Sequence, residues 1–302
     1  MNASVYACES FLQFVSALAD QPDADIRLEA AMLKLFSSHT LMDIADETLQ
    51  LRGGRGYENY ASQASRGDTA VAVERLYRSA RMMKIGEGGS NILQLYVMRC
   101  LLNDFLKVYK QISSKELPLM KRFNLFIQTC GQIVKGNIIP INMPKTAYPR
   151  PLKAHMRYAA KETRRMNRML LFKIAAEYLN YYIKKIKRFV SHSEQPIPPP
   201  DESFEQRQVL LGHCAQIAML LSAMTVTCQR AASEGKSEAI ELADAFCMDA
   251  REMISMHCIK ITNHHRKREN IMNRRGAEIM TGRYAGIVEQ NILRQDLPNI
   301  KD

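Results

Sequence analysis

The chain has 302 residues, of which 46% are hydrophobic and 24% are charged, and this balance is typical of a globular protein and excludes a disordered one. Its formal net charge is +11, and its seven cysteines are odd in number and form no C-x-x-C pair, which favours a compartment where thiols stay reduced. Fourteen glycines, eleven prolines and almost no strand-like alternation predict an all-α fold. The N-terminus shows no basic segment followed by an apolar core, so we expect no secretory signal and a cytoplasmic location.

Four helices are predicted in the first third of the chain. Apolar residues at helical spacing indicate helices over 2–20, 26–50 and 71–84, and a fourth that runs from Ser90, its expected N-cap, to Tyr109. Glycines stop the second helix, as is common at a helix C-terminus, and 58–72 is expected to be a loop.

The rest of the chain predicts a second helical region behind a connector. Residues 113–135 look helical in part, and the proline-rich stretch 139–151 is the best linker. Helices are expected over 152–190, 203–233 and 236–263, with a proline-rich turn at 195–201. Val209 to Cys228 is apolar enough for a membrane span, but polar residues interrupt it, and a buried bundle helix explains it better.

Positive charge is concentrated in one segment. Residues 145–190 hold thirteen Lys and Arg against two Glu, a net of +11 that equals the charge of the whole chain. Phe172, Ala176, Leu179, Ile183 and Ile186 form an apolar stripe at heptad spacing there. The basic side chains that lie largely off this stripe are Arg164, Arg165, Arg168, Lys184, Lys185 and Lys187. Such a face fits a solvated surface, an anionic membrane or nucleic acid, and the last ranks lowest because no nucleic-acid fold signature accompanies it.

Histidines and cysteines near the end of the last predicted helix do not indicate a metal site. His257, Cys258, His264 and His265 fit no familiar zinc spacing, and the surrounding Lys and Arg would repel a cation. No Walker sequence, Ser-His-Asp arrangement or dinucleotide fingerprint stands out.

Two glycine clusters between the predicted helices are the best candidates for a site. They are QLRGGRG at 50–56 and GEGGSN at 86–91, and glycine lets the backbone approach a ligand closely. A single carboxylate, Glu87, stands in the second cluster. A general base must sit within reach of its proton and lose its water, and a glutamate on a glycine hinge suits that requirement.

The order and spacing of these motifs resemble the C-terminal helical domain of the flavin-dependent acyl-CoA dehydrogenases. The resemblance rests on LEAAMLKLF at 28–36, the first glycine cluster, VERLYR at 73–78, and Glu87-Gly88 followed by NIL at 91–93. It covers 1–112 with specific motifs. Residues 150–260 look more loosely like the C-terminal extension of the very-long-chain members, after a connector over 113–150. The resemblance therefore implies a helical bundle over 1–112 and a second helical extension domain over 151–302.

The resemblance also implies a role for each cluster. Glu87 matches the base that removes the α-proton of an acyl-CoA thioester, and Gly88 matches a residue that touches the acyl chain. Gly86 stands where the family usually has an aromatic residue, so we expect it to widen the acyl pocket. The residues that match FAD contacts are Gln50, Leu51, Arg52, Gly53 and Gly54, on the FAD of a neighbouring subunit, and Gly89, Ser90 and Asn91.

Two functions follow as alternatives. One is the C-terminal part of an FAD-dependent, long-chain acyl-CoA dehydrogenase of fatty acid β-oxidation, a homo-oligomer or one half of a complemented pair, with electron-transfer flavoprotein as partner. Such a protein would draw its N-terminal and β-domains, which hold much of the flavin, from another chain. The other is a non-catalytic helical remnant that binds a membrane or a protein. The resemblance raises the lipid interpretation of the basic segment, with peripheral contact at the inner face of the membrane.

Overall fold

The computed structural model describes residues 1–113, 148–191, 207–263 and 266–283, and every regular element in these ranges is an α-helix. The chain forms two compact units, Met1–Cys258 and Ile259–Asp302. The expected connector falls almost wholly outside the described ranges, so the predicted domain boundaries stay a prediction. The all-α fold is confirmed.

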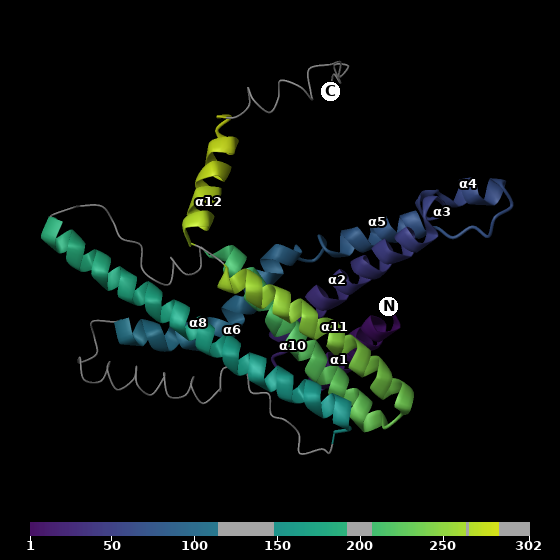
Figure 1. Ribbon diagram of the computed structural model, residues 1–302, viewed down its shortest axis with the longest axis horizontal. Helices are drawn as coiled ribbons and strands as arrows, with labels where there is room; N and C mark the ends of the chain where they lie inside the picture. Colours follow the sequence, from purple (N-terminus) through teal and green to yellow (C-terminus); the bar gives the residue numbers. More distant parts are fainter. Residues whose placement is uncertain (114–147, 192–206, 264–265, 284–302) are drawn as a thin grey trace. The chain divides into compact units, whose positions relative to one another are not determined.

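The first third of the chain contains the predicted helices and two short extra ones. Helix α1 (Asn2–Ala19), α2 (Arg27–Arg52), α5 (Val73–Met83) and α6 (Ser90–Ser113) lie close to their expected bounds. The stretch 58–72, expected to be a loop, instead contains α4 (Tyr60–Ser65), and α3 (Gly54–Tyr57) lies just before it. Helices α2 and α5 run side by side, with α3 and α4 at their far end (Figure 1).

Helix α10 (Gln208–Glu234) is the centre of the first unit. It packs against α1, α2, α6 and α8, and its side chains are buried on almost every face. Gly212 allows the close approach of α6, since a Cβ at this position would lie 2.9 Å from the side-chain oxygen of Gln94. The aromatic rings of Phe11, Phe36 and Phe246 continue the core from α1 through α2 to α11.

The apolar composition of α10 is explained by this packing. It is the one described helix long and apolar enough to cross a membrane, yet 72% of its apolar window is buried inside the protein. The expectation of a buried bundle helix is confirmed for Val209 to Cys228.

Helices α8 (Arg150–Ser191) and α11 (Ser237–Thr262) cover α10 from the other side (Figure 1). The Nε2 atom of buried His155 lies 2.7 Å from the Asp244 carboxylate, and the Arg251 guanidinium stacks over the Tyr158 ring at 4.5 Å. The apolar stripe expected on α8 does not lie on the buried face of that helix at Phe172 and Ile183. Leu170 is buried, whereas Phe172 is 78% exposed and Ile183 is 41% exposed.

In the second unit, α12 (Arg266–Met280) is a basic helix. Glu278 forms ion pairs with Arg274, Arg275 and Arg283.

Candidate functional site

The loop that carries Glu87 joins α5 to α6 and is conformationally unusual. Glu87 has φ = +56° and Gly88 has φ = +103°, so two consecutive residues lie outside the right-handed backbone regions. Few non-glycine residues adopt positive φ, and the strain persists only where neighbouring contacts enforce it. The Glu87 side chain is exposed to solvent. The loop therefore presents an isolated carboxylate on a constrained turn.

Contacts on both sides of Glu87 hold this turn. On one side, the Ser90 amide and hydroxyl both donate to the Lys84 carbonyl, each at 3.2 Å. On the other, Lys34 of α2 donates from Nζ to the Gly88 carbonyl at 2.7 Å. The expected N-cap was wrong: Ser90 is the first residue of α6, and the Gly89 carbonyl accepts the first helical hydrogen bonds from Ile92 and Leu93. The Ser90 hydroxyl reaches back toward the loop because the turn brings the Lys84 carbonyl within its range.

The first glycine cluster lies at the opposite end of α2. Gln50, Leu51 and Arg52 form its last turn, Gly53 ends it with φ = +59°, and Gly54 begins α3. Space is open where a Cβ would stand at Gly53 and at Gly54. Leu51 is 76% exposed. This stretch offers an uncovered backbone surface to a ligand or a neighbouring protein.

One buried side chain fixes the shape of this end. Gln63 of α4 donates from Nε2 to the carbonyls of Arg55, Glu58 and Val71, and its Oε1 accepts from the Val71 amide. Sequence reasoning missed Gln63 because a polar residue between two short helices carries no local pattern.

The structure does not bring the two glycine clusters of one chain together. Lys34, which contacts Gly88, and Gly53 at the end of α2 are nineteen residues apart. At the rise of an α-helix this separation is about 28 Å. Within the second cluster, the direct neighbours of Glu87 are Gly86 and Gly88, and Gly89, Ser90 and Asn91 follow them. Gly88 is the tightest of these, since a Cβ would meet the Leu93 side chain at 3.4 Å.

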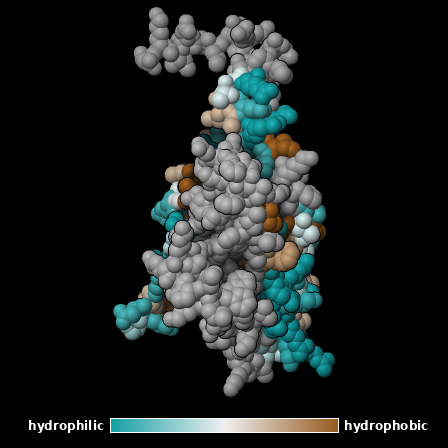
Figure 2. Space-filling view, turned by 90° about the vertical axis from the view of Figure 1, so that its left-hand side faces the viewer, coloured by the Kyte–Doolittle hydropathy of each residue, from teal (hydrophilic) through white to brown (hydrophobic). Residues whose placement is uncertain are grey.

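Large apolar side chains are uncovered around the Glu87 loop. Leu76, Met82, Met83, Ile85 and Ile92 are between 54% and 69% exposed. Hydrophobic residues reach the surface among hydrophilic ones in the face drawn in Figure 2. These exposed side chains give the surface near Glu87 an apolar character.

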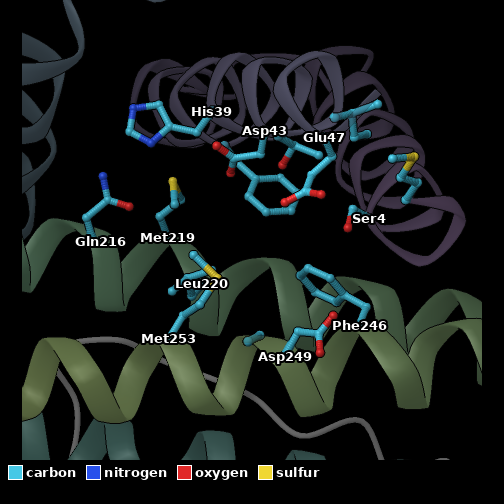
Figure 3. A pocket seen from close by; sticks show the side chains of 15 residues that line it. Ser4, His39, Asp43, Glu47, Gln216, Met219, Leu220, Phe246, Asp249 and Met253 are labelled. Carbon is cyan, nitrogen blue, oxygen red and sulfur yellow. The ribbon is translucent and has the colours of Figure 1, made fainter. Parts of the chain in front are cut away.

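A separate cavity lies between α1, α2, α10 and α11, with a volume of about 200 Å³. His39, Asp43 and Glu47 of α2 point toward it from one wall, and residues of α10 and α11, Leu220 and Phe246 among them, form the other (Figure 3). Burial, reinforced by Lys84 and Lys34, lowers the pKa of His39 to about 4.

Sequence reasoning missed this polar wall. Burial raises the pKa of the Asp43 carboxyl, and Lys84 opposes that rise. His39, Asp43 and Glu47 recur every fourth residue, so they share one face of α2, and that spacing was a signal in the sequence. Sequence reasoning also missed Lys34, for which the sequence carries no signal because its partner lies 54 residues away.

The structure describes four of the six basic side chains that were expected on the exposed face of α8. Arg164, Arg165, Arg168 and Lys184 are exposed, away from the buried face formed by residues such as Met166 and Leu170. The side chains of Lys185 and Lys187 lie outside those that the structure describes. Of the four residues considered as metal ligands, His264 and His265 are also outside, and the Nδ1 of His257 lies 3.1 Å from that of His213.

Comparison with known proteins places the chain near one family. Residues 1–102 match the model of the acyl-CoA dehydrogenase C-terminal domain. A probable acyl-CoA dehydrogenase of Mycobacterium tuberculosis is 27% identical over 310 residues, which cover 97% of this chain and 43% of that protein. The very long-chain specific acyl-CoA dehydrogenase of Bos taurus mitochondria is 36% identical over 92 residues, or 30% of this chain and 12% of that protein.

A solved structure shares the fold. The acyl-CoA dehydrogenase of Bacillus anthracis, crystallised with FAD, superposes with a TM-score of 0.56 at 20% identity, over 91% of this chain and 42% of that one. The chain therefore spans less than half of the length of these longer relatives. The resemblance to the acyl-CoA dehydrogenases, including the helical region after the C-terminal domain, is confirmed.

Proposed function

We propose that this chain is the C-terminal part of an FAD-dependent acyl-CoA dehydrogenase that introduces the α,β double bond into long-chain acyl-CoA. The observation that carries the proposal is the Glu87 loop, where an exposed carboxylate is presented on a strained turn that is fixed from both sides. The similarity to dehydrogenases over both parts of the chain supports the reaction class. The similarity to very-long-chain enzymes over 92 residues supports the choice of long-chain substrates.

Glu87 acts as the base in this proposal. An α-proton beside a thioester is only weakly acidic, so the carboxylate must lie within hydrogen-bond reach of it and be shielded from water. Glu87 is exposed in this chain, and the uncovered apolar residues beside it, Ile85 and Ile92, provide the surface on which acyl chain and cofactor exclude water. The Glu87 amide would polarise the thioester carbonyl, and Gly86 and Gly88 leave room for the acyl chain.

The residues present fit one edge of a flavin cofactor. Gly53, Gly54 and Gly89 have open space at the position of a Cβ, so a large polar molecule can approach their backbone amides. Gln50, Leu51 and Arg52 would line the first stretch, and Ser90 and Asn91 the second. FAD, when bound, supplies the hydride acceptor.

The position of the two stretches supports an oligomer. They lie about 28 Å apart along α2, which fits an arrangement where each flavin is completed by the Gln50–Gly54 stretch of a second copy. We propose that protein beyond these 302 residues supplies the rest of the flavin site, that electron-transfer flavoprotein takes the electrons, and that the enzyme is cytoplasmic.

A second proposal concerns the basic face of α8. Arg164, Arg168 and Lys184 are exposed beside the uncovered apolar side chains of Phe172 and Ile183. A basic amphipathic surface binds anionic headgroups, so we propose peripheral contact with the inner membrane face. The alternative of a non-catalytic remnant that only binds a membrane or a protein would retain this surface without turnover.

Substitution of the base separates these two functions. In the enzyme reconstituted with the N-terminal and β-domains of an acyl-CoA dehydrogenase, Glu87→Gln should lower kcat about 10²–10⁴-fold, because the amide keeps the shape but cannot accept a proton. FAD and acyl-CoA binding should change little. Glu74→Gln on α5, a carboxylate paired with Arg78, is the matched control and should keep full turnover. Turnover by Glu87→Gln within a few-fold of wild type would remove Glu87 from this role.

A further inference from the structure

We infer that Lys34 is a positioning residue for Glu87, an inference that rests on the function proposed above. The Lys34 ammonium donates to the carbonyl of Gly88, the residue directly after the base, at 2.7 Å. It reaches this carbonyl from the first third of α2, across 54 residues of sequence. A charged donor on a rigid helix is thus bonded to the Gly88–Gly89 peptide, one peptide unit beyond the one that joins Glu87 to Gly88.

The turn needs such an anchor because its backbone conformation is costly. Glu87 at φ = +56° occupies a region that few non-glycine residues adopt, and Gly88 at φ = +103° uses the freedom of glycine. The Ser90–Lys84 hydrogen bonds close the loop but do not fix the peptide between Glu87 and Gly89. Rotation of the Gly88–Gly89 peptide would turn the Gly88 carbonyl away from α2 and release the backbone that holds Gly88, and with it the preceding Glu87, in this turn. The bond from Lys34 opposes this rotation.

The surroundings of Lys34 strengthen the bond. Lys34 is half-buried, and α2 holds it in a helix whose neighbouring residues Leu35 and Phe36 are buried in the core. Hydrogen bonds from a charged donor are about twice as strong as those between neutral groups, and more so where water is partly excluded. The lysine therefore couples the position of the base to the rigid core of the bundle.

Cleavage by glutamyl endopeptidase, which cuts after Glu87 only when the turn opens, tests the anchor in the 302-residue chain without cofactor or substrate. Lys34→Met keeps the length of the side chain but loses the donor, so cleavage after Glu87 should be about tenfold faster or more. Lys34→Arg should restore most of the protection, since a guanidinium also donates. Lys84→Met removes a lysine of the same loop that takes part in the hydrogen bonds of the turn through its backbone carbonyl, which the substitution keeps, so this variant should be cleaved at the wild-type rate.

The cleavage pattern also separates local opening from unfolding. A faster cut after Glu87 alone marks a released turn, whereas faster cuts after Glu47, inside α2, mark loss of the helix. Should Lys34→Met fail to fold, acetylation of lysines in the wild-type protein decides the matter. Lys34 should react several-fold more slowly than Lys84, which is also half-buried. Equal rates, or unchanged cleavage after Glu87 in Lys34→Met, would overturn the anchor.

Kinetics of the reconstituted enzyme test the positioning role itself. Lys34→Met should lower kcat with little change in KM, and Lys34→Arg should recover it, because the substrate still binds while the base is misdirected. If cleavage shows that the turn is released in Lys34→Met but its kcat equals that of the wild type, Lys34 does not position the base. If Glu87→Gln leaves turnover intact, the proposed function fails, while the cleavage result on the turn stands by itself.

Discussion

Helices α5 and α10 belong to the same compact unit, but they are buried to very different degrees. Helix α10 packs against α1, α2, α6 and α8 and buries most of its apolar side chains. Helix α5 buries only Val73 and Ala80 and leaves Leu76, Met82 and Met83 exposed. Among the described residues, the core around α10 is closely packed, whereas the face that carries the Glu87 loop is exposed. Stability and the proposed chemistry are located in different parts of the bundle.

The largest expected effect comes from matched truncations of a leucine in each helix. Leu221→Ala in α10 removes a side chain that is 2% exposed, and it should lower the free energy of unfolding by about 2–5 kcal/mol through lost burial and the cavity left behind. Leu76→Ala in α5, which is 59% exposed, should change it by about 0.5 kcal/mol or less. Urea unfolding measures both. Equal losses would show that α5 is covered in solution and would contradict the contrast.

A pair of glycine substitutions tests the strained turn. Gly88→Ala places a Cβ at φ = +103° and within 3.4 Å of Leu93, so it should destabilise the turn by about 1–3 kcal/mol. Gly89→Ala, where a Cβ meets nothing within 4 Å and φ is not positive, should be nearly neutral. Hydrogen exchange of the amides of residues 86–91 reports both changes. Equal exchange in the two variants would mean that the turn is not held as described.

His39, which lines the cavity between α1, α2, α10 and α11, gives a pH dependence. Its folded pKa is lowered from 6.5 to about 4, mainly by burial, so the unfolded chain takes up the proton first as the pH falls. The free energy of unfolding is therefore unaffected by His39 above pH 6.5, where the imidazole is neutral in both states. It falls as the pH drops from 6.5 to about 4. His39→Gln should have a flatter profile of unfolding free energy over this window, measured by urea unfolding at a series of pH values. A profile parallel to wild type would exclude His39 as the cause.

The smallest effect per residue is expected on the basic face of α8. Each Lys or Arg near an anionic membrane contributes about 1 kcal/mol, and salt screens the attraction. Reversal of four charges to Glu should abolish co-sedimentation with anionic vesicles without loss of helix content. The residues are Arg164, Arg165, Lys184 and Lys185.

A charge-matched variant controls for the net charge of the chain. It reverses four arginines of the α3–α5 region instead and should still bind vesicles. These residues are Arg55, Arg66, Arg75 and Arg81. Equal vesicle binding by the two variants would show that total charge, and not the α8 face, drives attachment.

The sequence by itself determined the all-α fold and most of the helices. Helical spacing of apolar residues set the bounds of α1, α2, α6, α10 and α11 to within a few residues, because these helices bury one face or more and their pattern records it. It could not reveal α3 and α4, where Gln63 holds two short helices through hydrogen bonds instead of an apolar stripe. It also showed an apolar stripe through Phe172 on α8, but periodicity does not say which face of a helix meets a partner, and only the structure shows that Phe172 is exposed.

Only the tertiary structure decided how the Glu87 loop is held. The glycines around Glu87 allow a turn, but they do not specify which one, and the Ser90 hydroxyl bonds back to Lys84 only because the turn closes. The contact from Lys34 to Gly88 joins residues that are far apart in sequence and depends on the packing of α2 beside α6. Contacts of this kind involve a single donor and a backbone carbonyl, so they leave no periodic trace in the sequence from which they could be predicted.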